Sequence, residues 1–490
     1  MAKTFKDYLK ETGEVGAIRS IVHSIVYVSG LPGVRPKEMV VAEGGQRGIV
    51  QSLEPEMAEV LMLDTSDLVS NLQVTRTKET FTIPVSEEIL GRVVNPFGRS
   101  LDGLGPISGE KQNQPIEPSA PGINVRSRIT RPLETGATIV DLLVPIGYGQ
   151  RELVIGDKKT GKTTFLLQTI ANQAASGTVC VYVSIGKRVD DLKGVEEYLR
   201  KKDVLGRCAL VTASAADPAT MVYLAPYTGM SIAEYFRDKG SDVVIIFDDL
   251  TNHAKFYREL SLLSKRTPGR SSYPGDIFHA HAALLERAGN IQGALGKNVS
   301  ISAFPVAETL EGDMAGYIQT NLMAITDGHI YFDVNEFRKG SRPAVNPALS
   351  VSRVGNQTRE PVDKEFAQLV REDLSSYQRS LDIARFGVEL PERTRNQIER
   401  GEKIGTIFNQ DAAATVPRSL QLILLGLLLS GFWDGKGASL VKVDVIKLIA
   451  KHQKGELKSL EDQIGEVKSP SDLISLVKTA TKNVMEALYV

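Results

Sequence analysis

The spacing of apolar positions changes twice along the chain. Between Gly16 and Pro84, short β-prone runs are separated by Gly, Pro, Asn or Asp roughly every ten residues, which is typical of a small closed barrel. The runs are AIRSIVHSIVYV, EMVVAE, RGIVQSL, AEVLML and FTIPV. We therefore predict an N-terminal β-barrel, with a short segment before it, over residues 1–84.

A stretch with four prolines, Pro115–Pro132, follows and is typical of an extended connector. From about Leu143, apolar strands alternate with helical segments: RELVIG, TTFLLQTIANQAA, VCVYVSIG, a long helical region, and DVVIIFDD. Strands that are apolar throughout and separated by helices indicate a mainly parallel sheet covered on both faces. We predict an α/β domain over residues 85–355.

Residues 356–490 have helical spacing, few prolines and many Lys and Glu residues, which predicts a C-terminal α-helical bundle. The run Ser419–Trp433 is uncharged, but it is shorter than the roughly twenty residues that a bilayer span requires. We expect a buried core helix there. If the protein serves a membrane process, it does so from outside the bilayer.

Composition excludes several classes of function. The 58 Lys and Arg residues balance the 59 Asp and Glu residues, so no basic field for nucleic acid is expected. Two cysteines indicate neither a disulfide framework nor a metal site and fit a reducing compartment. The acidic Asp7, Glu11 and Glu14 argue against a transit peptide. His279 and His281 lie two apart and share no helix face, so a zinc site is not expected.

A phosphate-binding motif follows the strand RELVI and begins the amphipathic segment TTFLLQTI. Its glycines let backbone N–H groups point at phosphates, and the helix N-terminus adds its positive dipole end. The lysine reaches the outer phosphates and the threonine hydroxyl reaches Mg²⁺. The motif consists of Gly156, Asp157, Lys158, Lys159, Thr160, Gly161, Lys162 and Thr163, and Thr164 follows it.

A metal-binding carboxylate is expected at the end of a buried strand. The apolar run Val243–Phe247 is followed by Asp248 and Asp249. An acid at that point reaches Mg²⁺ directly or through water in P-loop proteins, and Asp248 comes first after the run. Asp as the cap of a strand-end turn is the structural alternative.

Longer strings resemble the alpha subunits of F-type ATP synthases. They include PIGYGQRELVIGDKKTGKT, YLAPYTGMSIAEYFRDKG, PGRSSYPGDIFHAHAALLERA, AGYIQTNLMAITDGHIYF and RPAVNPALSVSRVG. The similarity runs in order from about Ala17 to Arg353 and continues weakly into the helical end. It implies a β-barrel cap, a RecA-like domain that binds ATP or ADP with Mg²⁺, and a C-terminal helical domain.

The resemblance also implies partners and a location. Three alpha and three beta subunits form a ring around a central-stalk gamma subunit, and a peripheral-stalk delta-type subunit holds the ring. The ring docks on an ion-translocating membrane sector that conducts protons or sodium ions. We therefore expect a peripheral membrane protein on the cytoplasmic, matrix or stromal side of an energy-transducing membrane, with a bacterial cell membrane as the first expectation.

Two residues decide the expected role within such a ring. The catalytic beta subunit has Glu, and the alpha family normally Gln, where this chain has Lys187 after VCVYVSIG. An ammonium cannot accept a hydrogen bond from water, so the chain is expected to be non-catalytic. Lys187 either pairs with phosphate or points to solvent. By resemblance, Arg353 is an arginine finger that acts in trans in the neighbouring beta subunit's catalytic site. A structural ion pair is the alternative.

Other resemblances are partial. Arg342 and Pro343 match a segment near the adenine pocket, and Gln410 is the candidate glutamine for the base in a poorly matching run, FNQD followed by Ala412–Ala414. Leu310 stands where the family usually has Gln. The loop Pro268–Asp276 matches the segment that lines the central stalk. The N-terminal segment before Gly13 is short for a helix that binds the peripheral stalk.

Three other functions remain as alternatives. The first is a self-sufficient P-loop ATPase of the same fold, such as a beta-like subunit or a secretion-system ATPase; the missing Glu at Lys187 argues against it. The second is an RNA motor that resembles the Rho terminator, which would need exposed aromatics on the barrel. The third is a structural subunit whose phosphate cradle is unused.

Overall fold

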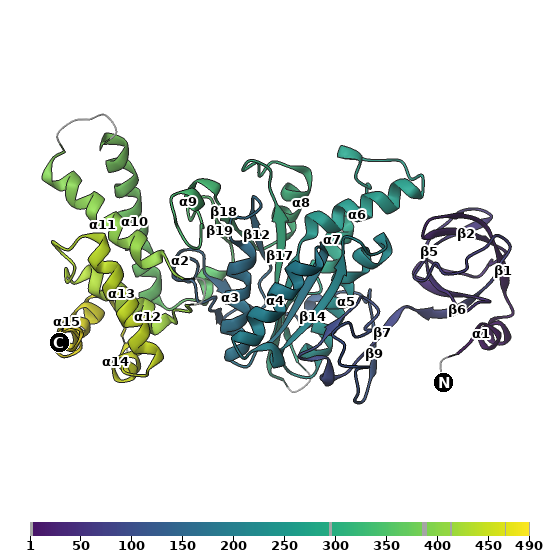
Figure 1. Ribbon diagram of the computed structural model, residues 1–490, viewed down its shortest axis with the longest axis horizontal. Coiled ribbons are helices and arrows are strands. Elements are labelled where there is room, and N and C mark those ends of the chain that lie inside the picture. The colour runs from purple at the N-terminus through teal and green to yellow at the C-terminus, as the bar shows by residue number, and fades with distance from the viewer. Residues whose placement is uncertain (1–2, 294–295, 385–389, 412–413, 466, 490) are drawn as a thin grey trace. The chain divides into compact units, whose positions relative to one another are not determined.

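The computed structural model describes residues 3–293, 296–384, 390–411, 414–465 and 467–489 (Figure 1). The chain divides into two compact units. The first unit comprises Met1–Ser127, Gly177–Glu308 and Met314–Ile325, and the second comprises Arg128–Ser176, Thr309–Asp313 and Thr326–Val490. The chain therefore passes between the two units several times.

Six strands of the first unit close into a barrel in the order β1-β2-β5-β4-β3-β6, with every neighbouring pair antiparallel. Alternate side chains, such as Val26, Val40 and Val60, fill its interior because successive side chains of a strand point to opposite faces. The predicted barrel is confirmed. Its strands are β1 (Val15–Val22), β2 (Ile25–Ser29), β3 (Glu38–Ala42), β4 (Arg47–Leu53), β5 (Met57–Met62) and β6 (Gln73–Thr80).

The strands that form the barrel do not coincide fully with the apolar runs from which the barrel was predicted. AIRSIVHSIVYV forms two strands joined at His23, whose φ is 54°, instead of one. FTIPV becomes β7 (Thr82–Val85), which pairs with β9 (Gln112–Pro115) outside the barrel. The sixth strand, QVTRTKET, was missed because its interior positions are polar rather than apolar. Burial of polar side chains in β6 requires hydrogen-bond partners, and the barrel supplies them.

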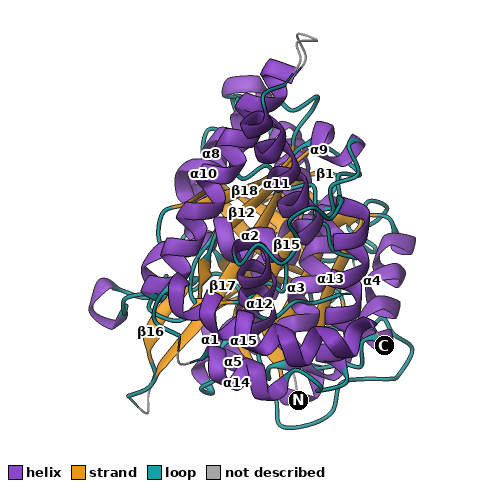
Figure 2. Ribbon diagram, turned by 90° about the vertical axis from the view of Figure 1, so that its left-hand side faces the viewer, coloured by secondary structure: helices purple, strands orange, loops and turns teal. Residues whose placement is uncertain are grey.

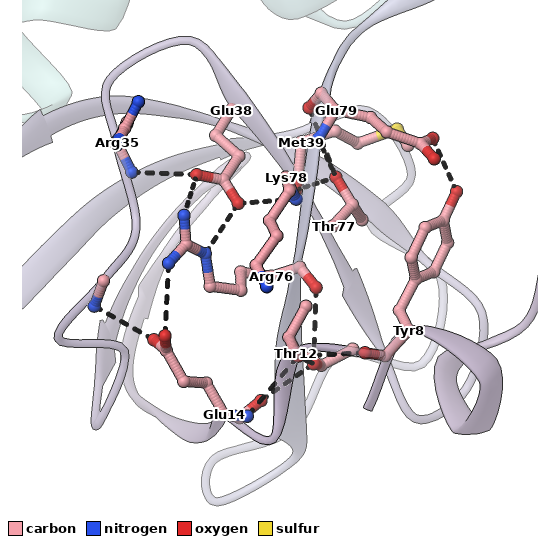
Figure 3. Close-up of polar contacts among 12 residues, drawn as sticks. Tyr8, Thr12, Glu14, Arg35, Glu38, Met39, Arg76, Thr77, Lys78 and Glu79 are labelled. Atoms are coloured by element: carbon pink, nitrogen blue, oxygen red, sulfur yellow. Dashed lines mark hydrogen bonds and ion pairs between the residues drawn. The ribbon is translucent and has the colours of Figure 1, made fainter. Parts of the chain in front are cut away.

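A buried ion cluster occupies one side of the barrel (Figure 3). Arg76 donates two hydrogen bonds to Glu38, at 2.8 and 2.9 Å, and one to Glu14 at 3.1 Å. The backbone N–H of Lys78 and that of Arg35 donate to the two oxygens of Glu38. Burial opposes ionisation of Glu38, but the donors outweigh it and lower its pKa. The cluster therefore joins three separate segments of the barrel through charge.

A short helix, α1 (Phe5–Thr12), precedes the barrel and packs against it. Phe5 and Tyr8 are buried in a small cluster with Val41, and the Tyr8 hydroxyl donates to Glu79 at 2.9 Å. Its left-handed C-cap, Gly13, ends the helix, as glycine commonly does. The apolar face of α1 is thus used within the chain.

The first unit also carries a parallel sheet in the order β17-β15-β13-β14-β8, with β16 antiparallel on β17. Helix α5 packs on four of these strands, β13, β14, β15 and β17. The strands are β8 (Val93–Val94), β13 (Val179–Lys187), β14 (Cys208–Ser214), β15 (Val243–Asp248), β16 (Gly289–Gln292) and β17 (Asn298–Glu308). The helices are α4 (Val189–Lys201), α5 (Ala219–Asp238), α6 (Leu250–Leu263), α7 (Ile277–Leu285) and α8 (Tyr317–Ile325).

Strand β14 lies inside the stretch that the sequence predicts as a long helical region. Its residues Ala209–Val211 are fully buried between β13 and β8. A short apolar run of this length has no periodicity that separates a buried strand from a buried helix turn. Neighbouring strands, rather than the local pattern, therefore decided its conformation.

The second unit combines a short sheet with a helical bundle. Strand β12 pairs with β18 in parallel, β19 is antiparallel to β18, and β10 pairs with β11. The strands are β10 (Pro132–Leu133), β11 (Ile146–Gly147), β12 (Glu152–Gly156), β18 (Gly328–Phe332) and β19 (Val351–Ser352). The helices are α2 (Thr138–Leu143), α3 (Lys162–Ala175), α9 (Val334–Arg338), α10 (Pro361–Ala384), α11 (Glu392–Phe408), α12 (Arg418–Leu429), α13 (Ala438–Gln453), α14 (Lys458–Ile464) and α15 (Pro470–Tyr489).

After η5 (Gly355–Thr358), all secondary structure within the described residues is helical, as Figure 2 shows in purple. Helix α12 covers most of the uncharged run Ser419–Trp433, and Leu420, Leu424 and Leu425 have no exposed surface. This confirms the expected core helix. In the part of the chain that the structure describes, no helix combines the length and apolar character of a bilayer span. The barrel, mainly parallel sheet and helical bundle that the sequence predicts are all found.

Candidate functional site

The phosphate-binding motif lies in the second unit between β12 and α3. Gly156 ends β12 with a φ of 155°, and a Cβ there would lie 2.4 Å from the carbonyl oxygen of Phe332 on β18. Gly161, with a φ of 96°, is the N-cap of α3. Both positions therefore require glycine, one because the adjacent strand is close and the other because of its backbone conformation. The loop is built for backbone N–H groups to face an anion at a helix N-terminus.

The motif lysine lies within this loop. The Lys162 ammonium donates to the carbonyl oxygens of Gly156 and Asp157, at 2.8 and 2.7 Å, and its side chain is buried. Thr160 also donates to the Asp157 carbonyl, at 2.8 Å. These hydrogen bonds hold the Lys162 ammonium at the N-terminus of α3, where its positive charge adds to that of the helix dipole. The predicted strand, loop and helix order is found here.

Asp157 joins the motif to the segment Thr309–Asp313. One carboxylate oxygen accepts hydrogen bonds from the Thr309 hydroxyl and from the Gly312 N–H, the latter at 2.9 Å. The Thr309 N–H donates to the Gly156 carbonyl at 3.1 Å. Leu310, which stands where the family usually has Gln, is 81% exposed beside this junction. Asp157 therefore acts as a structural support of the loop.

The remaining motif residues line the outside of the loop. Lys158, Lys159 and Thr164 are exposed, and Thr163 is partly buried in the first turn of α3. Lys159 has a φ of 63°, which marks the tight bend of the loop. A threonine in the first turn, next to a phosphate cradle, has the position from which its hydroxyl can reach a metal ion on phosphate.

The three adenine candidates lie together in the second unit. The Gln410 N–H donates to the Arg342 carbonyl at 2.7 Å. The Gln410 side chain accepts from the Thr138 N–H at 2.6 Å and donates to the Gly136 carbonyl at 3.1 Å. The Arg342 guanidinium stacks on Phe337 at 3.7 Å from the ring centroid. The amide of Gln410 is therefore used to cap α2, and Arg342–Pro343 lies beside it.

Helix α3 forms hydrogen bonds to the same segment that Gln410 contacts. Gln168, in the middle of α3, donates to the Gly136 carbonyl at 3.2 Å and to the Ala414 carbonyl at 2.7 Å. The helix that carries the phosphate cradle thus shares an acceptor with Gln410. Ala412 and Ala413, part of the poorly matching adenine segment, lie outside the described residues.

The predicted metal carboxylate lies in the first unit at the end of β15. Asp248 is 1% exposed; its Oδ1 forms an ion pair with Lys187 and its Oδ2 accepts from the Tyr182 hydroxyl at 2.6 Å. Both partners belong to β13, which pairs with β15 so that Ser184 lies opposite Asp248. The solvent-exposed position considered for Lys187 is not found, because its side chain is only 18% exposed and is turned toward Asp248.

Tyr182 is a functional candidate that the sequence analysis missed. A tyrosine inside the otherwise apolar strand VCVYVSIG is a usable signal, because a buried phenol requires a hydrogen-bond partner. Burial and the adjacent Asp248 carboxylate raise the pKa of Tyr182 well above its usual range, so its proton stays available for donation.

Asp249 has a different role from its neighbour. Its side chain accepts from the Asn252 N–H at 2.6 Å and is the N-cap of α6. Burial, with the negative charge of Glu308 beside it, raises the pKa of Asp249 to about 7. The two consecutive acids are therefore divided between an ion pair and a helix cap, and the cap alternative raised for Asp248 applies to Asp249.

The donor set only partly fits a magnesium ion. Mg²⁺ prefers oxygen ligands, and the Thr163 hydroxyl next to the cradle fits that preference. The Asp248 oxygens are engaged by an ammonium and a phenol, which are donors rather than metal ligands. Within the described residues, no group of three or more His, Cys, Asp or Glu side chains could hold a metal ion.

Arg353 follows β19 in the second unit and is exposed. Its backbone N–H donates to the Asp327 carbonyl, and its guanidinium donates to the Thr326 carbonyl at 3.4 Å. The Asp327 carboxylate is instead bound by Arg151, through bonds of 2.7 and 3.0 Å. Over the described ranges, no carboxylate forms an ion pair with Arg353. The structural ion pair that the sequence analysis kept as an alternative is therefore not found.

A buried histidine pair and an exposed loop, both in the first unit, add no side chain to the phosphate-binding loop. His253 and His281 are fully buried and approach each other at 3.1 Å, and burial lowers the pKa of each. The His253 ring packs against Tyr223 and Tyr227 of α5. The loop Pro268–Asp276 has Tyr273 packed under the Arg258 guanidinium at 4.7 Å, and most of its residues are exposed.

Comparison with known proteins gives a consistent picture. Residues 136–352 match the nucleotide-binding domain of the ATP synthase alpha/beta family, and residues 360–484 match the C-terminal domain of the ATP synthase alpha/beta chain. Relatives named ATP synthase subunit alpha, from Staphylococcus aureus strains JH9, JH1 and Mu3, are 41% identical over 422 residues, which cover 86% of this chain and 84% of theirs.

Proposed function

The chain belongs to the family of F-type ATP synthase alpha subunits, and we propose that it binds ATP or ADP without hydrolysing it. As an alpha subunit it is part of an ATP synthase complex and peripheral to a membrane. The cradle Gly156–Thr163 takes the phosphates, with Lys162 as the charge on the outer ones. Arg342, Pro343 and Gln410 are the candidates near the base.

The observation that carries the non-catalytic assignment is Lys187. A hydrolytic site requires a carboxylate that accepts a hydrogen bond from the attacking water. At this position the chain has an ammonium, which is bound to Asp248 and can only donate. The acid that the catalytic beta subunits carry there is absent from the sequence.

We assign Arg353 as an arginine finger that acts in trans on the catalytic site of a neighbouring beta subunit. Its exposure and the lack of a carboxylate partner in the described part of the chain support this role, because a neutralised arginine would stabilise little additional charge. A planar guanidinium suits the equatorial oxygens of a transferring phosphoryl group.

The proposed partners are three beta subunits in a ring with three alpha subunits, a central-stalk gamma subunit and a peripheral-stalk delta-type subunit. Because α1 packs against the barrel, its apolar side chains Phe5 and Tyr8 are not available to a stalk subunit in this arrangement. We place the ring on the cytoplasmic side of a bacterial cell membrane. Mg²⁺ would accompany the nucleotide through Thr163, and Asp248 remains the predicted carboxylate near it.

Assembly with its own beta and gamma subunits tests the proposal. The purified chain should bind nucleotide and show no steady-state ATP hydrolysis, while the assembled ring hydrolyses ATP. Arg353→Lys should lower ring turnover about a thousandfold while nucleotide affinity of the lone chain stays the same. Arg393→Lys, at an exposed position of α11, is the matched control. Rapid hydrolysis by the lone chain, or normal turnover with Arg353→Lys, would contradict the proposal.

A further inference from the structure

In the second unit, Glu152 lies on β12, two strands away from the segment that carries Arg353. Strands β12, β18 and β19 are neighbours (Figure 1), with Glu152 opposite Gly328 and Gly328 opposite Ser352. We propose that Glu152 positions Arg353 for the catalytic site of the neighbouring beta subunit, acting through a buried chain of hydrogen bonds. The inference rests on the proposed function, because it concerns the arginine assigned there.

The first argument is the gap that Gly328 leaves in the central strand of the three. A side chain at this position would normally separate the side chains of β12 from those of β19. A Cβ on Gly328 would lie 2.6 and 2.9 Å from the two carboxyl oxygens of Glu152. The carboxyl therefore occupies the space that a larger residue in β18 would fill.

The second argument is the chain of hydrogen bonds that joins Glu152 to β19. The Gln150 amide donates to Oε2 of Glu152 at 2.7 Å and to the Ser352 hydroxyl at 3.1 Å. The Gln150 carbonyl oxygen accepts from the Gly147 N–H at 2.9 Å, which fixes the orientation of the amide. Both amide protons are thus used, so the position of Gln150 depends on the carboxyl as well as on the hydroxyl.

The Ser352 hydroxyl extends the chain to the backbone around Arg353. It donates to the Pro145 carbonyl at 2.6 Å and accepts from the Gly355 N–H at 3.1 Å, in addition to the hydrogen bond from Gln150. A hydroxyl has one proton and two lone pairs, so its hydrogen-bonding capacity is fully used. The backbone on both sides of Arg353 is therefore held, while the arginine itself is exposed.

The third argument is that Glu152 is uncharged in this arrangement. It has no exposed surface, and its Oε1 has no hydrogen-bond partner within the described residues. An ionised carboxylate in such a place requires a cation or several donors, whereas a neutral amide is the donor here. Burial, with the negative charge of Asp327, raises the pKa of Glu152 well above its usual range, although Gln150 and the charge of Arg353 oppose the rise.

An uncharged Glu152 leaves Arg353 available to a phosphoryl group. The charged and titratable groups on the neighbouring strands are Arg151 on β12, Asp327 and His329 at β18, and Arg353 after β19. Arg151 is already bound to Asp327, and burial lowers the pKa of His329. An ionised Glu152 would therefore attract the Arg353 guanidinium and hold it back from the neighbour's phosphate.

The test is the pH profile of ATP hydrolysis by the ring that this chain forms with its own beta and gamma subunits. As the pH rises from about 6 to about 9.5, Glu152 loses its proton, so wild-type kcat should fall about tenfold relative to a Glu152→Gln ring. At neutral pH the uncharged Gln should keep kcat within about twofold of the wild type, because it preserves the hydrogen bond to Gln150. Glu152→Met removes that acceptor and should lower kcat about tenfold with KM unchanged.

Further variants separate positioning from a general structural role. Glu365→Gln removes a glutamate charge at an exposed position of α10 and should leave kcat and its pH profile unchanged. In a ring that already carries Arg353→Lys, Glu152→Met should cause no further loss, because Glu152 acts only through the arginine. If Glu152→Gln does not assemble, Ser352→Ala breaks the same chain and should lower kcat about tenfold only while Arg353 is present.

Each failure has its own signature. Parallel pH profiles of the wild-type and Glu152→Gln rings would overturn the inference, as would an equal loss from Glu152→Met with and without Arg353→Lys. Unchanged kcat in Ser352→Ala would do the same. Normal turnover of the Arg353→Lys ring would refute the arginine finger itself, and with it this inference. Low turnover of that ring, with no effect of the Glu152 variants, would leave the proposed function intact and remove only the inference.

Discussion

Two buried pairs of a cation and a carboxylate in the first unit are built differently. In the barrel, Arg76 binds Glu38 through two parallel hydrogen bonds, and two backbone N–H groups complete the carboxylate (Figure 3). At the end of β15, Lys187 binds a single oxygen of Asp248. The first pair involves strand residues held on several sides, whereas the second depends on a flexible lysine that follows a glycine.

The difference teaches which buried charges are structural and which can serve a ligand. A bidentate arginine in a closed barrel has a fixed geometry and no other partner to reach. A lysine on a four-carbon stem, at the carboxyl end of parallel strands, is placed where α/β folds bind their ligands. The Arg76 pair therefore specifies the barrel, whereas the Lys187 pair lies at a strand end, where a predicted ligand carboxylate is already paired with an ammonium.

The largest loss of stability is expected when Arg76 is replaced. Arg76→Met leaves Glu38 buried without its partner, which should destabilise the barrel by about 3–5 kcal/mol. Hydrogen exchange of the amides in β3 and β6, followed by mass spectrometry, measures the loss locally. Arg19→Met, at an exposed position of β1, is the control and should cost less than about 1 kcal/mol. A similarly small loss of stability in both variants would mean that the Arg76 cluster does not stabilise the barrel.

The two regions should also respond to pH in opposite directions. The pKa of Glu38 is lowered in the folded chain, so its contribution is present above its usual value of 4.5 and is lost as the pH falls. The pKa of Asp249, beside the Lys187 pair, is raised from 3.8 to about 7. The folded chain thus holds that proton more tightly, and stability is lost as the pH rises from about 4 through 7.

The substitution Asp249→Asn separates the pH dependence that Asp249 causes from that of Glu38. The amide keeps the helix cap but does not titrate, so the wild type should lose about 4 kcal/mol relative to the variant between pH 4 and pH 8. Urea unfolding of both chains at several pH values measures this difference. Asp190→Asn, an exposed acid in the first turn of α4, is the reference. Parallel pH profiles for the wild type and Asp249→Asn would show that Asp249 does not carry the proton.

A smaller effect is expected from the phenol that completes Asp248. Tyr182→Phe removes one hydrogen bond to a buried charge and should cost about 2 kcal/mol of stability. Urea unfolding of Tyr182→Phe and of the wild type measures this loss. Equal stability of the two chains would show that the phenol contributes nothing to the buried carboxylate.

The smallest effect concerns the helix before the barrel. Tyr8→Phe removes the hydrogen bond to Glu79 while keeping the packed ring, and should loosen α1 by about 1 kcal/mol. Hydrogen exchange of α1 should then quicken about fivefold, with no change in the Arg76 cluster. Equal acceleration in β6 would mean that helix and barrel open together rather than separately.

Much of the site could be derived from the sequence because its elements are local. The cradle depends on consecutive residues between one strand and one helix, and Gly156 and Gly161 have the backbone roles that the motif requires. The apolar runs predicted the barrel, the parallel strands and helix α12 since burial of alternate or helical faces is a property of neighbouring residues. Strands β6 and β14 escaped because polar clusters and short apolar runs have no such local signature.

What the sequence by itself determined is therefore the family, the phosphate cradle and the absence of a catalytic acid at Lys187. Only the tertiary structure decided that Lys187 is bound to Asp248, that Tyr182 completes the carboxylate, and that Gln410 caps α2. Each of these contacts joins residues far apart in the chain. Strand register and helix packing bring such residues together, and those depend on the whole fold rather than on any single segment.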